Sequence, residues 1–398
     1  MRIYFFFLRL AAWLGHRKAR KLVQGQSEAL DRLRKADIRG AIWIHAASVG
    51  EFEQARPLIE LIRHRQPQQK ILLTFFSPSG YEMRKNYELV DLVTYLPFAT
   101  KRNAREFLDI VQPSMALFVK YEFWPAYLKE LRKRCIRTYL ICGIFYRKQL
   151  FFRWYGIPYR HLLDCFTQLF VQDSNSMRLL KDYGIQHVEV CGDTRFDRVA
   201  TVCHNHKRIP IAEKFVQQAH TRILVAGSTW PKDEALLARY VQDNPDVRLI
   251  LVPHEIDAKH LDYIFHLFRG RLARYTETNE VLADKVPVLV VDTMGLLSSL
   301  YQYAQVAYVG GGFGAGIHNT VEPALYGIPV VFGPKYKPFR EARNLIKQSA
   351  AFSIHNYRTL REALDRAFAE QIFMGTAAHE YCHSELGATE NIYKLLFH

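Results

Sequence analysis

Two glutamates that follow strand-like runs in the first half of the chain could take part in acid–base chemistry. Glu51 comes after the apolar run at residues 41–45, and Gly50 permits a sharp turn into a helix that starts near Glu51. A glutamate in a first helical turn can simply complement the helix dipole and stay ionised. The alternative is a general base at a cleft. The dipole lowers a carboxylate pKa whereas burial raises it, and a base that takes a proton from a hydroxyl gains from burial, so we expect a partly desolvated Glu51.

Glu122 lies between aromatic residues in a segment that follows another strand-like run, an unusual setting for a solvated acid. Three roles stay open for it: holding a hydroxyl group, orienting a base, or capping the next helix. Arg195 follows the last strand-like run of the first half, and its planar guanidinium suits a carboxylate or a phosphate. Its alternative role is an interdomain salt bridge with Asp193 or Asp197.

A glycine-rich stretch in the second half, residues 310–316, lies between two apolar runs. The pattern predicts a strand, a loop, a short helix and a second strand. We expect Gly311 and Gly312 to let the backbone approach a ligand and to direct amide groups outward at a helix start, where phosphate binds well. The alternative is that these glycines only make a tight turn. The spacing fits neither a Rossmann fingerprint nor a P-loop.

The short helix after the glycines is expected to begin near Val321, with Asn319 or Thr320 as its cap. Glu322 would then stand in the first turn, where it could accept hydrogen bonds from a ribose diol or remain a solvated acid.

Three further loops of the second half follow strand-like runs and could bind a nucleotide. Ser228 opens a helix and marks a second candidate phosphate cradle, while main-chain groups at Pro253-His254 and at residues 292–295 could grip a nucleobase edge. A lone histidine such as His254 or His318 is more often structural than chemical. The sequence has no Asp-x-Asp pair and no His/Asp cluster at metal-ligand spacing, so we expect no required metal.

Strand-like apolar runs recur along the chain and alternate with helical stretches, which predicts βαβ units and mostly parallel sheets with helices on both faces. The runs lie at residues 41–45, 70–75, 92–96, 115–119, 138–142, 168–171 and 188–191, and then at 222–226, 247–252, 286–291, 306–309 and 330–332. We therefore predict an α/β fold of two doubly wound, Rossmann-like domains facing a central cleft. Ligands of such sheets bind at the carboxyl ends of strands, where every segment above falls.

The length of 398 residues allows two domains, and the 49% hydrophobic content allows full cores. We place an N-terminal domain at residues 26–205 and a C-terminal domain at 206–398, and leave open whether the last helix returns to the first domain. The net charge of +15 indicates an anionic partner: a phosphorylated substrate, an acidic membrane surface or nucleic acid. The six cysteines contain no CxxC pair and indicate reduced, buried thiols of a cytosolic protein.

Residues 1–14 are apolar and aromatic apart from two arginines, and basic residues follow at 16–21. The run is too short for a comfortable bilayer span, which needs about 20 apolar residues. It also lacks the charge placement of a secretory signal. We expect residues 1–25 to form an interfacial membrane anchor that keeps the rest of the chain in the cytoplasm. The alternative is an amphipathic helix packed on the protein.

Taken together and in this order, the segments at residues 45–51, 122–125, 192–197, 227–229, 292–295 and 318–323 resemble those of the 3-deoxy-D-manno-octulosonic acid (Kdo) transferase family. The resemblance covers nearly the whole chain. It implies a GT-B glycosyltransferase on the cytoplasmic face of the inner membrane, which transfers Kdo from CMP-Kdo to the lipid A precursor lipid IVA. Inversion at the anomeric carbon and the absence of any metal or other cofactor are also implied.

The resemblance also implies roles for individual residues. Glu51 would be the general base, and Glu122 and Arg195 would stabilise the transition state. The segments implied to bind CMP comprise Pro253, His254, Met294, Gly295, Leu296, Asn319, Thr320, Val321 and Glu322, to which the phosphate cradles add Ser228, Gly311 and Gly312.

The sequence departs from the family pattern at four places. His254 stands where arginine is usual, Leu296 where an acid is common, and Arg195 where lysine is common, and the glycine loop is shorter. The first two departures put side-chain contacts to the nucleotide in doubt. The nearest rival is a GT-B enzyme that uses a UDP-sugar, such as a hexosyltransferase or a 2-epimerase. A non-catalytic protein that binds lipid or nucleic acid would concentrate its charge in one stripe, whereas here basic residues occur in both halves, so no nucleic-acid partner is expected.

Overall fold

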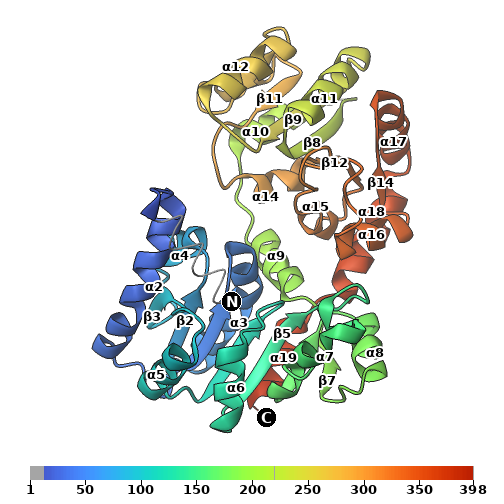
Figure 1. Ribbon diagram of the computed structural model, residues 1–398. Helices are drawn as coiled ribbons and strands as arrows, with labels where there is room; N and C mark the ends of the chain where they lie inside the picture. Colours follow the sequence, from blue (N-terminus) through green and yellow to red (C-terminus); the bar gives the residue numbers. More distant parts are fainter. Residues whose placement is uncertain (1–12, 219, 398) are drawn as a thin grey trace. The chain divides into compact units, whose positions relative to one another are not determined.

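The computed structural model describes residues 13–218 and 220–397, which form two compact units (Figure 1). The first unit comprises Met1–Arg198 together with Leu386–His398, and the second comprises Val199–Glu385. The helix α9 (Thr194–His204) carries the chain from the first unit to the second. The boundary predicted from the sequence, between residues 205 and 206, lies at the end of this helix. The cleft expected between the two units stays a prediction.

The first unit is a seven-stranded parallel sheet in the order β3-β2-β1-β4-β5-β6-β7. Its strands are β1 (Ile42–Ala46), β2 (Ile71–Phe75), β3 (Leu92–Tyr95), β4 (Met115–Val119), β5 (Arg137–Gly143), β6 (Gln168–Val171) and β7 (Val188–Val190). Its helices before α9 are α2 (Arg17–Lys35), α3 (Val49–Arg65), α4 (Pro78–Arg84), α5 (Lys101–Val111), α6 (Pro125–Lys133), α7 (Ile157–Arg160) and α8 (Ser174–Asp182).

The strands of the first unit are buried on both faces, as parallel sheets covered by helices must be. In β1 the side chains alternate between two cores: Ile42 and Ile44 pack in one with Phe52 of α3, and Trp43 packs in the other with Phe107 of α5. This alternation follows from the two-residue period of a strand.

The second unit repeats the plan with a parallel sheet in the order β10-β11-β9-β8-β12-β13-β14. Its strands are β8 (Arg222–Thr229), β9 (Val247–Pro253), β10 (Leu272–Arg274), β11 (Val288–Val290), β12 (Val306–Val309), β13 (Val330–Phe332) and β14 (Ala351–Ser353). Its helices after α9 are α10 (Pro210–Val216), α11 (Pro231–Asp243), α12 (Ala258–Leu267), α13 (Glu280–Ala283), α14 (Leu297–Leu300), α15 (Val321–Leu325), α16 (Arg340–Lys347), α17 (Tyr357–Ala369) and α18 (Gln371–Ser384).

Each sheet has a point at which the strand order reverses direction. In the first unit it lies between β1 and β4, and in the second between β8 and β12. Ligands of open parallel sheets bind outside the carboxyl ends of strands at such a switch point. The segments that the sequence singled out, after β1 and β4 and after β8 and β12, stand at these two places.

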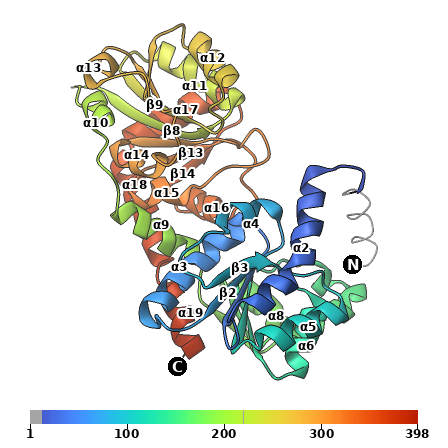
Figure 2. The same ribbon diagram turned by 90° about the vertical axis from the view of Figure 1, so that its left-hand side faces the viewer.

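The last helix, α19 (Ala388–Phe397), belongs to the first unit and packs against α3 (Figure 2). Asp197 fixes the start of this segment, because its carboxylate accepts the amides of Gly387 and Thr389, both at 2.7 Å. Ile392 and Leu396 then enter the same core as β1. Asp197 therefore binds the returning chain within the first unit.

Residues 1–12, which carry most of the apolar run of the predicted anchor, lie outside the described residues. The remainder of that segment runs into α2, where Ala19, Leu22 and Gly25 are buried against the first unit while basic side chains such as Arg17 and Lys18 are exposed. Among the described residues, no helix combines the length and the apolar character needed to cross a bilayer.

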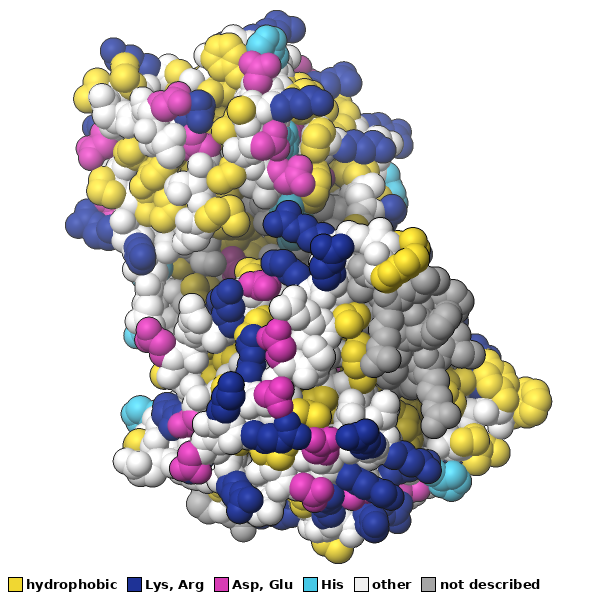
Figure 3. All heavy atoms as spheres, turned by 60° about the vertical axis from the view of Figure 1, so that its left-hand side comes forward, with side chains coloured by type: hydrophobic (Ala, Val, Ile, Leu, Met, Phe, Trp, Pro, Cys, Tyr) yellow, Lys and Arg dark blue, Asp and Glu magenta, His cyan; other side chains and the backbone are white. Residues whose placement is uncertain are grey.

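Charged side chains of both signs are intermingled on the surface. Figure 3 shows Lys and Arg spread over one face of the molecule with Asp and Glu between them. Several arginines are paired with acids, such as Arg63 with Asp91 and Arg222 with Asp246. The excess of +15 is therefore dispersed on this face rather than gathered in one continuous stripe.

Candidate active site

The carboxylate of Glu51 lies at the start of α3, where it forms a capping box with Ser48. Its Oε2 accepts hydrogen bonds from the Ser48 amide at 2.8 Å and the Ser48 hydroxyl at 3.0 Å, and that hydroxyl accepts the amide of Glu51 at 3.4 Å. The box satisfies donors that a helix start leaves unpaired. Its Oε1 has no hydrogen bond to any described residue, so one carboxylate oxygen can accept a proton.

The environment of Glu51 favours a basic carboxylate. The side chain is half-buried, and burial raises its pKa above the ordinary value of a glutamate. The nearby charge of Glu122 raises the pKa further, whereas the hydrogen bonds from Ser48 and the neighbouring His45 act in the opposite direction. Desolvation outweighs the hydrogen bonds, in agreement with the expected partly desolvated Glu51. The capping role considered as the alternative is present at the same time.

Glu122 is buried at the end of β4 and binds two aromatic rings. Its Oε2 accepts the indole N–H of Trp124 at 2.6 Å and lies 3.2 Å from Nε2 of His45. The other ring nitrogen of His45 lies 2.9 Å from the hydroxyl of Thr74. Of the three roles left open by the sequence, capping the next helix does not hold, because α6 begins after Trp124 without a side-chain cap.

His45 is a residue whose part in this cluster the sequence analysis missed. It is fully buried in β1, a strand otherwise made of apolar residues. A polar ring in such a strand must find hydrogen-bond partners. That signal was present in the sequence, but its partners Thr74 and Glu122 are distant along the chain and only the sheet brings them together.

Arg195 pairs with the fully buried Asp193 inside the first unit. Its Nε and Nη2 donate to Asp193 Oδ2 at 2.9 and 2.7 Å, and its amide donates to Oδ1 at 3.0 Å. Burial alone would raise the pKa of Asp193, but the guanidinium and its hydrogen bonds hold the pKa below the ordinary value. Gln54 Nε2 completes the site by donating to Oδ1 at 3.1 Å. The guanidinium is thus held rigidly, with its side chain about one-third exposed (34%).

In the second unit the glycines allow backbone segments to approach very closely. A Cβ at Gly310 would lie 2.3 Å from the carbonyl oxygen of Ser228, and one at Gly312 would lie 2.6 Å from Cα of Gly333. Ser228 itself has a positive φ of 53°, where β8 is interrupted beside β9. Packing at the switch point therefore requires these glycines, a role that differs from the tight turn considered as the alternative to ligand binding.

The amide of Gly311 does not point outward as expected. It donates to Oδ2 of the buried Asp233 at 3.0 Å, and the hydroxyl of Tyr308 donates to Oδ1 at 2.7 Å. Burial raises the pKa of Asp233, and these hydrogen bonds oppose the rise. A buried carboxylate thus shapes the loop by holding one of its amides. Because Asp233 lies far from the glycines in the chain, no local pattern in the sequence indicates this contact.

Glu322 occupies the first turn of α15 and is held at both oxygens. The hydroxyl of Ser298 donates to Oε2 at 2.7 Å, and the side-chain amide of Asn319 donates to Oε1 at 2.9 Å. Burial raises the pKa of Glu322, opposed by these two donors. A carboxylate oxygen can accept further hydrogen bonds. Glu322 is therefore orientated in a way that still permits contact with a diol.

The cap of α15 differs from the prediction in detail. Asn319 Oδ1 accepts the amide of Val321 at 3.0 Å, whereas Thr320 occupies the cap position without a side-chain hydrogen bond to the helix. Thr320 is fully buried, and its hydroxyl finds no partner among the described residues. Val321 is also buried. The buried side chains of Thr320 and Val321 therefore pack in the interior beneath the glycine loop rather than facing a ligand.

Three aromatic rings stack beside the glycine loop. His254 stacks between Trp230, at 4.8 Å, and His318, at 4.5 Å, and Trp230 donates its indole N–H to Nε2 of His318 at 3.2 Å. Burial, helped by the nearby His254, lowers the pKa of His318. From the sequence, His254 and His318 were interpreted as isolated histidines, and Trp230 was not singled out. The amide of His254 also donates to the Thr229 carbonyl at 2.9 Å, which ties the end of β9 to β8.

The loop after β11 presents Met294, which is exposed, Gly295, which has a positive φ of 85°, and Leu296, which is half-buried at the start of α14. Asp292 anchors this loop. It accepts the hydroxyl of Thr276 at 2.6 Å and pairs with Arg274 at 2.9 Å. Its pKa is lowered because these contacts outweigh its burial.

Contacts connect all four loops of the second unit. A Cβ at Gly227 would meet Leu297 of α14, the Thr229 carbonyl accepts the amide of His254, His254 stacks on His318, and Ser298 reaches Glu322. The carboxyl ends of β8, β9, β11 and β12 therefore converge at one site, with Pro253 as the buried last residue of β9.

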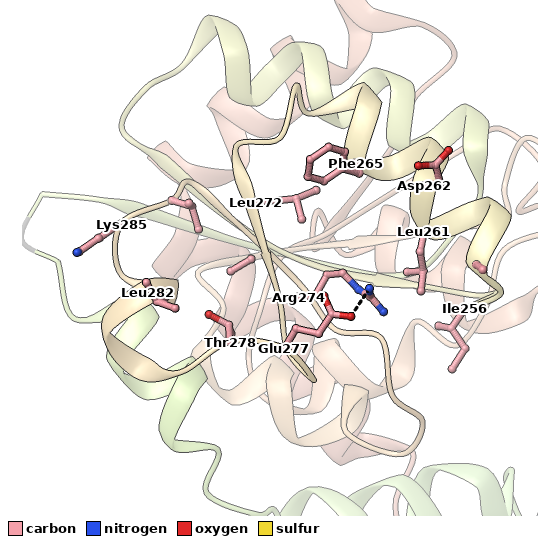
Figure 4. Close-up of a pocket in the computed structure, with 13 residues that line it drawn as sticks. Ile256, Leu261, Asp262, Phe265, Leu272, Arg274, Glu277, Thr278, Leu282 and Lys285 are labelled. Carbon is pink, nitrogen blue, oxygen red and sulfur yellow. Dashed lines mark hydrogen bonds and ion pairs between the residues drawn. The ribbon is translucent and has the colours of Figure 1, made fainter.

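A separate hollow of about 810 Å³ lies beside α12 and β10 (Figure 4). In the close-up Arg274 and Glu277 face each other, with an ion pair of 2.5 Å between them. None of the residues predicted to bind the nucleotide lines it. The hollow is therefore distinct from the converging loops.

One prediction about metals needs correction. The fold brings Glu255, Asp257 and His260 together, with one potential ligand atom from each within 4.8 Å of the others. Asp257 already caps α12, and Nε2 of His260 lies 2.9 Å from the buried Glu234. The expectation that no such group exists is wrong, while the expectation that the activity needs no metal stays a prediction.

Comparisons with known proteins find relatives that cover most of the chain. A family profile described as "3-Deoxy-D-manno-octulosonic-acid transferase (kdotransferase)" matches residues 16–198. The 3-deoxy-D-manno-octulosonic acid transferase of Aquifex aeolicus is 26% identical over 331 residues, which cover 80% of this chain and 83% of that protein. The transferase of the same name from Haemophilus influenzae is 27% identical over 380 residues, which cover 89% and 86%. These relatives support the resemblance to the Kdo transferase family that the sequence motifs indicate.

The fold comparison confirms the predicted class. UDP-GlcNAc 2-epimerase from Neisseria meningitidis, bound to UDP-GlcNAc, superposes with a TM-score of 0.64 over 89% of this chain and 99% of that one. Its sequence identity is 13%, so the likeness shows the shared GT-B architecture and does not favour the rival UDP-sugar activity.

Proposed function

We propose that this protein is a Kdo transferase that moves Kdo from CMP-Kdo to lipid IVA, with inversion and with Glu51 as the general base. The observation that carries the proposal is the half-buried Glu51 carboxylate at the switch point of the first unit, with one oxygen held by Ser48 and the other without a hydrogen-bond partner among the described residues. Its raised pKa suits proton abstraction from a hydroxyl.

The reaction balances as a single displacement. Oε1 of Glu51 accepts the proton of the acceptor hydroxyl. At the same time the oxygen of that hydroxyl forms a bond to the anomeric carbon of Kdo. The bond from that carbon to the phosphate oxygen of CMP breaks, and the electron pair leaves with CMP. Attack from the side opposite the leaving group inverts the anomeric centre. Glu122 holds His45 and Trp124 beside this carboxylate, and its charge keeps Glu51 basic.

Arg195 is proposed to stabilise negative charge in the transition state. Its guanidinium is fixed against Asp193, so little freedom is lost when an anion binds its exposed edge. The Kdo carboxylate and the leaving phosphate both suit this group.

The second unit is proposed to bind the CMP moiety through its converging loops. Glu322, orientated by Ser298 and Asn319, is placed to accept hydrogen bonds from the ribose. The backbone at Gly295 and Leu296 is proposed to contact the cytosine edge, since neither residue offers a polar side chain. Because His254 is stacked between two rings, we expect it to contribute a flat surface rather than an ionic contact.

We propose that the protein works on the cytoplasmic face of the inner membrane, where a lipid acceptor resides. Support comes from the segment around α7, in which Trp154 is 85% exposed and Tyr155, Ile157 and Tyr159 are also exposed. The exposed Arg153 adds positive charge there. Exposed Trp and Tyr beside basic residues suit the interface of an anionic bilayer.

One incubation tests the proposal. Purified protein is mixed with CMP-Kdo and lipid IVA, and products are read by mass spectrometry. The expected product is the acceptor with added Kdo, together with CMP. Parallel arms contain UDP-GlcNAc with the same acceptor and UDP-GlcNAc alone. Transfer or epimerisation in those arms, without Kdo transfer in the first, would replace the proposal with the rival activity. In a binding arm, CMP should raise the melting temperature more than UDP does.

A further inference from the structure

A strongly cationic pocket lies on the first unit between the first turns of α5 and α6. It has a volume of about 740 Å³, and its lining includes Lys101, Arg102, Arg105, Lys129, Lys133 and one acid, Glu130. The two helices pack side by side, so the pocket is a fixed feature of the unit rather than a property of a loop. The pocket contains no residue that the sequence analysis assigned to a site.

Most of its positive charge is uncompensated within the protein. Glu130 is engaged by Arg134 at 3.0 Å and, more loosely, by Arg105 at 3.7 Å. The other four cations, Lys101, Arg102, Lys129 and Lys133, form no ion pair or side-chain hydrogen bond with any described residue, and all four are exposed.

The positive charges at the start of α5 also destabilise that helix. Lys101 and Arg102 are the first two residues of α5, and the first turns of both α5 and α6 contain no acid. Cations at a helix start are unfavourable because they face the positive end of the dipole. A local choice that conflicts with stability is expected at functional sites. An anion in the pocket would relieve the conflict in both helices.

The position of the pocket relates it to the proposed base. Pro125, which lines the pocket, begins α6 and directly follows Trp124, the indole of which binds Glu122. Glu122 in turn is close enough to Glu51 to raise its pKa. A molecule with its hydroxyl at Glu51 could therefore extend an anionic group toward the start of α6.

We infer that this pocket binds a phosphomonoester group of the lipid acceptor. A phosphomonoester carries about −1.5 to −2 charges near neutral pH and three strong acceptor oxygens, which suit four unpaired cations. The inference rests on the proposed function, since the acceptor of that reaction is a phosphorylated lipid. The pocket would act as a positioning site that sets the distance between the phosphate and the attacking hydroxyl.

The test compares a double variant, Lys129→Gln with Lys133→Gln, with a matched control, Lys35→Gln with Lys181→Gln. The control removes the same charge from exposed lysines of the same unit that lie outside the pocket and form no ion pair or side-chain hydrogen bond with any described residue. Full-length protein is used throughout. With phosphorylated acceptor, the pocket variant should raise KM about tenfold with little change in kcat, since two charge-assisted contacts are lost. The control should match wild type.

A phosphatase-treated acceptor sharpens the result. Wild type and control should prefer the phosphorylated acceptor, and the pocket variant should lose that preference. Equal preference in the pocket variant and the control would overturn the inference.

A binding arm separates this inference from the proposed function. Co-sedimentation with phosphatidylcholine vesicles that contain phosphatidic acid or phosphatidylglycerol, at matched surface charge, needs no catalysis. Wild type should favour phosphatidic acid, the phosphomonoester, and the pocket variant should not.

Competition by inorganic phosphate at constant ionic strength would show that the phosphate group itself is recognised, and no competition would show that the lipid is also needed. If wild type transfers no Kdo yet shows this preference, the proposed function fails and the anion pocket stands. If wild type shows no preference for phosphatidic acid, the pocket assignment fails.

Discussion

Titratable side chains lie at the carboxyl end of β1 in the first unit. Glycines and stacked rings lie at the carboxyl end of β8 in the second unit. Both sheets are parallel and seven-stranded, and each has a switch point beside its first strand in the chain, although their strand orders differ where β11 lies between β10 and β9. In the first unit, Glu51, Glu122 and His45 interact through side chains in a partly desolvated setting. In the second, Gly310 and Gly312 bring main chains together, and Asp233 holds the loop from within.

The difference indicates a division of labour on one architecture. Proton transfer needs a carboxylate with a raised pKa, which burial and a like charge provide in the first unit. Gripping a nucleotide needs closely placed main-chain groups and orientated acceptors, which glycines and buried carboxylates provide in the second. Changes in the first unit should therefore affect turnover, and changes in the second should affect nucleotide binding.

The largest effect is expected from Glu51→Gln. Glutamine at this position can still accept from Ser48 and keep the capping box, but it cannot take a proton. Turnover should fall by about 10²–10⁴-fold with little change in melting temperature. Glu53→Gln, two residues further along α3, is the control and should retain near wild-type turnover. A Glu51→Gln enzyme with wild-type turnover would remove this residue from the mechanism.

Gly312→Ala should give the next largest effect. The added Cβ would lie 2.6 Å from backbone of Gly333, so something must shift. We expect a loss of about 1–3 kcal/mol in the free energy of unfolding and weaker CMP binding. Gly314→Ala is the matched control in the same loop, since its nearest contact would be 3.5 Å. Denaturant unfolding and calorimetry measure the two quantities, and equal behaviour of the two variants would contradict the packing argument.

A smaller effect is expected on the pH dependence of kcat. Glu51 must be deprotonated to act, so the rate should rise with pH through its pKa, which is raised above the ordinary glutamate value. Glu122→Gln removes a like charge and should lower that pKa, which moves the acidic limb of the profile to lower pH. An unchanged or upward-shifted limb would show that Glu122 does not act on Glu51 through its charge.

The smallest effect is expected from metal removal. The group formed by Glu255, Asp257 and His260 has structural contacts of its own, and the proposed displacement uses no metal. Kdo transfer in the presence of EDTA should equal that without it. If EDTA abolishes Kdo transfer and an added divalent cation restores it, the reaction needs a metal and the proposed metal-free displacement is wrong.

The sequence predicted the fold well where apolar runs were clear. The strands at residues 115–119, 168–171, 306–309 and 330–332 were predicted with the bounds they have. Two strands were missed, β10 (Leu272–Arg274) and β14 (Ala351–Ser353). Both lie at edges of the second sheet, are three residues long and are incompletely buried, so neither produces an apolar run.

The candidate site was predicted in part for a related reason. Glu51 and Glu322 could be found because each stands beside a turn that follows an apolar run. Contacts such as Gly311 with Asp233, or Glu122 with His45, join residues far apart in the chain, and nothing local marks them. The expectation of an outward amide at Gly311 was wrong because this amide donates its hydrogen bond to the carboxylate of Asp233, which is distant in the chain.

The division of labour is tested most directly by titrating CMP into Glu51→Gln and Gly312→Ala while Kdo transfer is measured on the same preparations. The account predicts that Glu51→Gln binds CMP as wild type does but transfers Kdo about 10²–10⁴-fold more slowly, and that Gly312→Ala binds CMP more weakly. Loss of CMP affinity in Glu51→Gln, with wild-type affinity in Gly312→Ala, would contradict it.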